Sequence, residues 1–294
     1  MTTASGLLLV DKPEGFTSHD VVAKLRGIVG TRKIGHAGTL DPMATGLLVI
    51  GVNSATKLLT FLVGEDKTYI ATIRLGASTI TDDRESEFLS VAASNTVDAL
   101  TELDVTEAIR PLTGQIMQVP SSVSAIKIDG ERAYAKVRGG DEVKLAARPV
   151  TIGRFHVLGP IRRETVGDHH FVDLDVIIDC SSGTYIRALA RDLGDALKVG
   201  GHLSALRRTR VAGFTTAGAA SIAALKGAEF STLDLADVAR VTFPVREIGL
   251  DEKLELSFGR TLAANPADGI YAGVSAANEL IALLSNVDGK AKPI

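Results

Sequence analysis

The twelve residues from Gly35 to Gly46 hold three glycines, one proline, His36 and Asp41, and the apolar run 47–50 follows directly. Glycine lets the backbone turn tightly and lets a bulky ligand approach it closely. The proline after Asp41 biases this aspartate away from helical geometry, toward an extended or turn conformation. The sequence therefore predicts a shaped loop that presents a carboxylate at the edge of a sheet.

Taken singly, these residues favour structural roles. An aspartate before proline is commonly a turn or cap residue, and His36 between glycines can be a turn residue as well. Arg187 falls in the first turn of a predicted helix, where it opposes the helix dipole, so a carboxylate partner is expected. One cysteine, Cys180, and six scattered histidines give no metal-ligand spacing, and no phosphate-binding loop is found.

The composition is that of an ordinary globular protein, with 294 residues, 45% of them hydrophobic and 23% charged. This length suffices for one large domain and a small one. No run approaches the ~18 apolar residues of a membrane span. No signal peptide is visible, and a single cysteine fits a reducing compartment, so a cytoplasmic protein is expected.

Charge is segregated along the chain, although the net charge is only −3. Residues 121–163 carry nine Lys/Arg against four Asp/Glu, whereas 82–110 carry eight Asp/Glu against two arginines. Residues 181–210 are also basic and 164–180 acidic. Such blocks can build one basic face for binding phosphates, and solvated loops of mixed charge are the simpler interpretation.

Hydrophobic spacing predicts strands near 6–10, 47–52, 67–75, 149–158 and 170–179. Helices are expected after caps at Ser18, Ser54 and Thr184, with a short basic helix at 131–138 and a loop and helix within 82–110. This order predicts a mixed α/β or α+β sheet rather than regular βαβ alternation.

The pattern of apolar and polar residues changes beyond about residue 245. Short apolar runs at 254–258, 270–274 and 279–284 alternate with Gly, Asn and Asp, which predicts a small β domain. The chain stops soon after a glycine-rich turn. The last strand of this domain is therefore expected to be clipped or poorly ordered.

Six segments together resemble the TruB-type tRNA pseudouridine synthases, in the same order and between about residues 6 and 215. They are Leu8–Pro13, Gly35–Gly46, Asp66–Tyr69, Gln118–Pro120, Gly183–Arg187 and Leu206–Arg208. The tail weakly resembles the PUA-type RNA-binding domain of such enzymes. The resemblance implies a largely antiparallel catalytic domain over 1–240, with an RNA-clamping insertion at about 121–150, and a PUA-like domain over 245–294.

The family converts uridine 55 in the T loop of tRNA to pseudouridine, without redox cofactor, nucleotide or metal. By resemblance, Asp41 is the nucleophile, Arg187 is its counter-ion, and Tyr69 stacks on the flipped base and handles protons. Attack on C1′ and attack on the uracil ring both stay open.

The resemblance also implies substrate contacts. His36 fills the space that the flipped base vacates, Tyr185 and Leu206 line the uracil pocket, and Lys12 supports the catalytic loop from behind. Arg207, with Arg208 and Arg210, is expected to contact phosphates.

One departure from the family pattern concerns the segment 79–83. Ile80 stands where family members often carry an aspartate, and Asp83 keeps the second aspartate of that pattern. Asp83 is therefore a further candidate for substrate binding.

The expected partner is the tRNA T stem-loop, bound by a monomer without guide RNA or membrane. Three alternatives stay open. They are a guide-dependent synthase of the same superfamily, a non-catalytic tRNA-binding or tRNA-folding protein and, ranked last, a hydrolase using Asp41 and His36.

Overall fold

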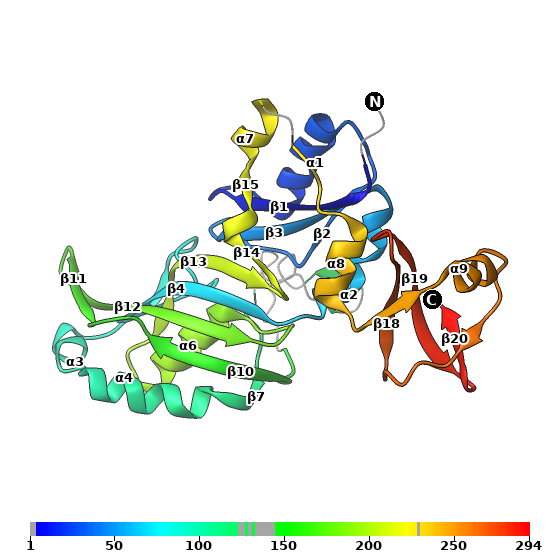
Figure 1. Ribbon diagram of the computed structural model, residues 1–294. Helices are drawn as coiled ribbons and strands as arrows, with labels where there is room; N and C mark the ends of the chain where they lie inside the picture. Colours follow the sequence, from blue (N-terminus) through cyan, green and yellow to red (C-terminus); the bar gives the residue numbers. More distant parts are fainter. Residues whose placement is uncertain (1–3, 123–126, 129–130, 133–144, 228–229) are drawn as a thin grey trace.

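The computed structural model describes residues 4–122, 127–128, 131–132, 145–227 and 230–294. A large sheet and a smaller one organise this part of the chain, and the smaller sheet forms a lobe of its own (Figure 1). Among the described helices, none has the length and apolar character needed to cross a membrane.

The large sheet is mixed, and most of its neighbouring strands are antiparallel, which confirms the predicted fold class. Its main path runs in the order β15 (Ala220–Ser221), β1 (Gly6–Lys12), β3 (Thr45–Val52), β13 (Gly201–Val211), β4 (Lys67–Leu75), β12 (His169–Cys180), β10 (Arg148–Val157) and β7 (Gly114–Gln118). Three strands branch from this path: β2 (Ile34–Ala37), β11 (Arg162–Val166) and β14 (Phe214–Thr215).

Helices cover both faces of the large sheet. The helical segments are α1 (Ser18–Val29), η1 (Asn53–Lys57), α2 (Leu59–Val63), α3 (Ser94–Asp98), α4 (Glu102–Ile109), η2 (Arg110–Leu112), α6 (Ile186–Ala196), η3 (Thr216–Gly218), α7 (Ile222–Gly227), α8 (Leu235–Thr242) and α9 (Leu250–Ser257). Two short hairpins complete the described elements: β5 (Ala77–Thr79) with β6 (Phe88–Val91), and β8 (Lys127–Ile128) with β9 (Glu131–Arg132).

Strand β1 is apolar along most of its length because both of its faces are buried. Leu7 and Leu9 pack in the cluster that contains α2 and α8 residues, whereas Leu8 and Val10 pack in the cluster under α1 and α7. Strand β4 has only one deeply buried face, so its side chains alternate between buried and more exposed. Helices α4 and α6 contribute to the core on this face. These contrasts follow from whether a strand is covered on one face or two.

The cap of α1 differs from the prediction by one residue. Thr17, not Ser18, is the N-cap, and it forms a reciprocal capping box with Asp20. The hydroxyl of Ser18 is therefore available to the loop that contains Asp41, and it accepts a hydrogen bond from the Leu40 amide at 2.9 Å.

Other predicted helices also need correction. Tyr185 is the N-cap of α6, because the Thr184 hydroxyl donates to the Ser181 carbonyl instead. Ser54 lies inside the 3-10 segment η1, which has no side-chain cap. Of the predicted helix 131–138, the first two residues form β9, and the other six lie outside the described residues.

The smaller sheet lies at the C-terminal end of the chain. Its strands follow the order β16 (Val245–Ile248), β18 (Ile270–Ser275), β19 (Leu280–Val287), β20 (Lys290–Pro293) and β17 (Leu262–Ala263). The run 254–258 was predicted as a strand, but 254–257 belong to α9, where Leu250 and Leu254 share the i, i+4 spacing of a helix. The expected disorder of the last strand was wrong, because β20 pairs with both β19 and β17.

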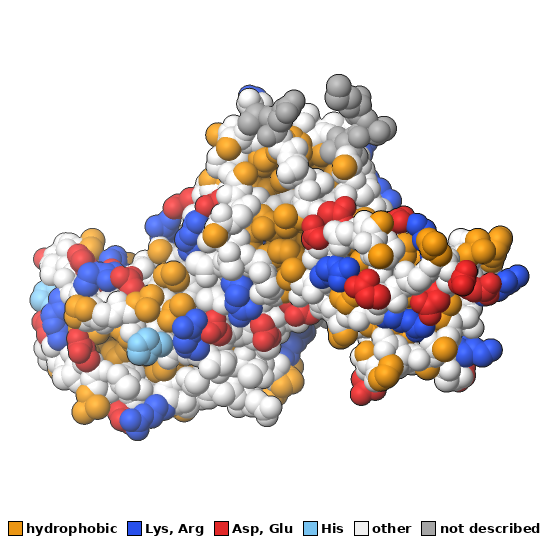
Figure 2. All heavy atoms as spheres, in the orientation of Figure 1, with side chains coloured by type: hydrophobic (Ala, Val, Ile, Leu, Met, Phe, Trp, Pro, Cys, Tyr) orange, Lys and Arg blue, Asp and Glu red, His pale blue; other side chains and the backbone are white. Residues whose placement is uncertain are grey.

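The segregated charges of the sequence are partly neutralised across neighbouring strands. Strand β12, from the acidic block, pairs with β10 and with β11, which carry arginines of the basic block. Arg154 pairs with Asp179 at 2.8 Å, and Arg162 pairs with Asp175. On the face shown in Figure 2, lysine and arginine side chains are interspersed with acidic ones instead of forming a continuous basic patch.

The centre of the sheet opens where β3 meets β13. These strands pair in parallel at only two positions, Thr45 with Arg207 and Gly46 with Arg208. The loop that leads into β3 lies at this opening. Gly46 has φ +98°, and a Cβ at this position would lie 2.2 Å from the Arg208 carbonyl oxygen. Only glycine permits this approach of two backbones.

We predict that Gly46→Ala lowers the free energy of unfolding by about 3 kcal/mol or more, since it adds both a clash and a strained φ. Urea denaturation of the variant and the wild type measures the change. Gly27→Ala is the matched control, because Gly27 is an exposed residue of helix α1 with open space around its Cα. We expect this control to be neutral or stabilising. Equal midpoints for Gly46→Ala and wild type would contradict the prediction.

Candidate active site

A cavity of about 360 Å³ lies at the opening of the sheet, a size typical of small-molecule sites. The loop after β2, strands β4 and β13 and the start of α6 enclose it. It brings together six residues that the sequence singled out: Asp41, Tyr69, Tyr185, Arg187, Leu206 and Arg208. Lys12, His36, Asp83 and Arg207 are absent from its lining.

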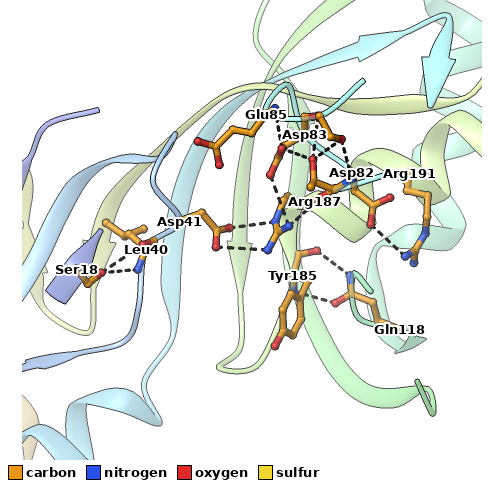
Figure 3. A network of polar contacts seen from close by, with 12 residues as sticks. Ser18, Leu40, Asp41, Asp82, Asp83, Glu85, Gln118, Tyr185, Arg187 and Arg191 are labelled. Atoms are coloured by element: carbon orange, nitrogen blue, oxygen red, sulfur yellow. Dashed lines mark hydrogen bonds and ion pairs between the residues drawn. The ribbon is translucent and has the colours of Figure 1, made fainter. Parts of the chain in front are cut away.

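Asp41 and Arg187 form a two-point ion pair at one wall of this cavity (Figure 3). The Arg187 Nε lies 3.0 Å from Asp41 Oδ2, and Nη2 donates to Oδ1 at 3.3 Å. The Arg187 side chain is 7% exposed, and that of Asp41 is 36% exposed. A planar guanidinium therefore holds an accessible carboxylate in one orientation.

A second set of acceptors lies against Arg187. Its Nη1 donates to the Thr81 carbonyl at 2.8 Å and lies 3.5 Å from Asp83 Oδ2. Asp83 is nearly fully buried and also accepts hydrogen bonds from the Thr81 hydroxyl and the Glu85 amide. Asp83 therefore contacts Arg187 rather than the cavity, and the sequence-based expectation of a direct substrate contact does not match its position.

The loop that contains Asp41 is held by Lys12, on the side away from the cavity. Lys12 is fully buried, and its Nζ donates to the carbonyls of Pro13, Phe16 and Pro42. Burial lowers the pKa of Lys12 to about 8, although the nearby Asp41 carboxylate opposes this shift. Lys12 thus supports the loop without reaching the cavity.

Tyr69 is buried beside two cations that also line the cavity, Lys67 and Arg208. Burial raises the pKa of the Tyr69 phenol, and the Arg208 guanidinium opposes the shift in part. Arg208 is 1% exposed and donates to the carbonyls of Leu47 and Gly38. Arg208 therefore supports the backbone of the Asp41 loop and of β3 and, as part of the cavity lining, faces the cavity rather than the outer surface.

Lys67 was missed as a site residue in the sequence. It lies two residues before Tyr69 in the sequence, and this proximity could have identified it as a candidate. Its Nζ donates to the carbonyls of Val63 and Glu65, and burial lowers its pKa.

His36 and Arg207 lie close to the cavity but outside its lining. The His36 ring packs edge-on against His19, with centroids 5.5 Å apart, and its buried Nδ1 has no hydrogen-bond partner within the described residues. Burial, and then the neighbouring His19 and Arg208, lower the pKa of His36. Arg207 is 40% exposed and pairs with Asp11 at 2.7 Å.

No group of three or more His, Cys, Asp or Glu side chains in the described ranges is arranged to hold a metal ion. The residues that converge on the cavity are instead a carboxylate, cations, two tyrosines and a leucine. Such a set suits nucleophilic chemistry on an aromatic ring that enters the cavity.

Comparisons with known proteins cover almost the whole chain. Residues 26–186 match the family model of the TruB family pseudouridylate synthase N-terminal domain. Residues 187–245 match the tRNA pseudouridylate synthase B C-terminal domain, and residues 243–294 match the tRNA pseudouridine synthase II C-terminal model.

Among solved structures, the fold resembles a chain from an H/ACA ribonucleoprotein bound to a substrate RNA containing 2′-deoxyuridine. The TM-score is 0.71 at 23% identity, over 98% of this chain and 83% of that one. A chain from a Cbf5–Nop10–Gar1 complex gives a TM-score of 0.69, also at 23% identity, over 98% of this chain and 82% of that one. At this identity, the similarity concerns the fold alone.

Relatives named tRNA pseudouridine synthase B are much more similar in sequence. The protein from Arthrobacter sp. (strain FB24) is 54% identical, over 99% of this chain and 95% of its own length. The one from Nocardia farcinica (strain IFM 10152) is 55% identical, over 98% of this chain and 92% of its own length. Together with the matching family models, these relatives show that the chain belongs to the TruB family of pseudouridylate synthases.

Proposed function

We propose that this protein isomerises uridine 55 in the T loop of tRNA to pseudouridine, with Asp41 as the nucleophile. The observation that carries the proposal is the ion pair between Asp41 and the nearly buried Arg187, at the wall of a cavity that also contains Tyr69. The pair holds one carboxylate oriented, close to a compensating cation and open to a ligand. A nucleophilic carboxylate needs these three properties.

The reaction conserves every atom of the nucleoside. The N1–C1′ glycosidic bond breaks, the uracil turns over, and a C5–C1′ bond forms. The proton on C5 is then lost, and N1 gains one. Asp41 bonds transiently to the nucleoside and is released at the end, so the site needs to move only protons and one base.

The target base has to leave the stacked T loop before it can reach Asp41. Extrusion costs a few kcal/mol, which contacts in the pocket have to replace. Tyr69, Tyr185 and Leu206 offer an aromatic and aliphatic lining for this purpose. Because burial raises its pKa, the Tyr69 phenol stays neutral and can donate a proton or a hydrogen bond. His36 occupies the vacated space in the RNA, and Arg207 lies at the rim as a phosphate contact.

The domain limits of the proposal follow the two sheets. The catalytic domain comprises residues 1–240, and a PUA-like RNA-binding domain comprises 245–294, starting with β16. An RNA-clamping insertion at about 121–150 falls largely outside the described residues. The enzyme acts as a monomer without guide RNA. Relatives that are 53–55% identical and named tRNA pseudouridine synthase B favour this over a guide-dependent role.

A non-catalytic RNA-binding protein would keep basic residues but has no need for the Asp41–Arg187 pair inside a cavity. The partly exposed Asp41 carboxylate, held at two points by a guanidinium, therefore favours the enzyme over this alternative.

Asp41→Asn removes the negative charge but keeps the shape of the side chain. We expect pseudouridine formation in a T-arm stem-loop to fall by about 10⁴-fold or more, with RNA affinity largely kept. Product formation and RNA binding are measured separately, and Asp251→Asn, on exposed α9, is the control. Turnover near the wild-type rate would refute the proposed nucleophile.

Arg187→Lys keeps the charge but cannot bind Asp41 at two points while also donating to Thr81. We expect kcat to fall about 100-fold, with a smaller effect on KM, because the nucleophile loses its orientation. Steady-state kinetics on the stem-loop measure both constants. Arg162→Lys, at the exposed pair with Asp175, is the control and should keep its kcat. An unchanged kcat for Arg187→Lys would argue against the role of the ion pair.

The lowered pKa of Lys12 predicts how the stability of the protein depends on pH. The pKa of Lys12 is about 8 in the folded protein, whereas the ordinary lysine value of 10.5 applies in the unfolded chain. Between these two pH values the unfolded state therefore binds more protons than the folded state. The free energy of unfolding therefore rises with pH across this window because of Lys12, and the contribution is flat outside it.

Lys12→Met abolishes this contribution. We expect the difference in unfolding free energy between wild type and Lys12→Met to grow as the pH rises from about 8 to 10.5. Urea denaturation at several pH values measures it. Lys226→Met, at an exposed lysine on α7, should show a constant difference. A constant difference for Lys12→Met as well would show that burial does not perturb this lysine.

A further inference from the structure

Gln118 is the last residue of the edge strand β7, and its buried side chain leaves the sheet to reach the start of α6 (Figure 3). Its Nε2 donates to the Tyr185 carbonyl at 3.1 Å, and the Tyr185 amide donates to Oε1 at 2.8 Å. One side chain thus binds both backbone polar groups of a single residue.

This contact requires an amide. A carboxamide carries a donor and an acceptor in one plane, as a peptide group does, so the two hydrogen bonds reproduce a step of an antiparallel ladder. A carboxylate can accept from the Tyr185 amide but cannot donate to its carbonyl. Tyr185 is also the N-cap of α6, with extended backbone and no side-chain cap bond. The Gln118 amide therefore fixes the residue from which the helix begins.

The next residue on the same segment adds a second link to α6. The Val119 carbonyl accepts a hydrogen bond from Arg191 Nη2 at 2.7 Å. Arg191 lies one helical turn after Arg187, so the end of β7 is attached to α6 on both sides of the residue that pairs with Asp41. Tyr185, the residue that Gln118 binds, is itself part of the cavity lining.

We propose that Gln118 is a positioning residue for pseudouridine formation, which sets the Tyr185 ring and the Arg187 guanidinium relative to the Asp41 loop. Gln118 is not part of the cavity lining, so it acts through these two residues and does not touch the substrate. The inference rests on the proposed function, because the effect of Gln118 is measured as a change in the rate of pseudouridine formation.

Gln118→Glu tests this role because protonation can restore the lost donor. At about pH 8 the introduced carboxylate faces the Tyr185 carbonyl, and we expect kcat to fall at least about tenfold, with KM less affected. Burial favours the protonated carboxyl, which again donates to that carbonyl. The ratio of variant to wild-type kcat should therefore rise as the pH is lowered from about 8 to about 5.5.

Gln115→Glu is the matched control, because Gln115 is exposed on the same strand and its ratio to wild type should stay near one at every pH. Arg148, opposite Gln118 in the register of β10, and the nearby Arg191 and Asp82 are unchanged in both variants. Wild type and Gln115→Glu therefore show how these neighbours affect kcat over the same pH range.

Gln118→Met provides an uncharged variant of similar length, should the introduced carboxylate unfold the protein at high pH. It loses both hydrogen bonds, so a lowered kcat that acid does not restore supports the proposal. Wild-type kcat in Gln118→Met, or a Gln118→Glu ratio that does not rise on acidification, overturns it. If wild type and Gln115→Glu make no pseudouridine, the proposed function has failed instead.

Discussion

The ion pair between Asp41 and Arg187 is the interaction on which the site depends. Removing a guanidinium from water is costly unless all of its donors find acceptors. For Arg187 this cost is offset by Asp41 on one side and by the Thr81 carbonyl and Asp83 on the other. Because these acceptors come from different segments, the pair forms only once the fold is complete. A charge placed in this way is preorganised for chemistry before any substrate arrives.

Much of the surrounding structure holds one of the two partners. Gly46 lets the catalytic loop leave the sheet against β13, and Lys12 fastens the same loop through the Pro42 carbonyl. On the opposite side, Gln118 fixes the residue from which the helix bearing Arg187 begins. A glycine, a buried lysine and a buried amide thus all help to hold Asp41 and Arg187 in place, although they lie far apart in the sequence.

The sequence indicated the fold class and a carboxylate partner for Arg187 for physical reasons, and the family resemblance identified that partner as Asp41. Apolar runs in β1 and β3 and alternation in β4 report burial on two faces or one. Arg187 was conspicuous because a cation in the first turn of a helix opposes the dipole. What sequence could not supply was long-range register. Lys67 and Arg208 line the same cavity only because β4 and β13 are neighbours in the sheet. The short apolar run 254–258 fits a strand as well as a helix, so the helix α9 was predicted as a strand.

The central claim is that the protein itself, without guide RNA, acts on one uridine of the T loop. A pseudouridine map of an unmodified tRNA transcript, treated with the purified wild-type protein alone, tests it most directly. We expect a single new pseudouridine at position 55 and none in a transcript with cytidine at that position. An unmodified position 55, or pseudouridine that forms only after a guide RNA is added, would contradict the claim.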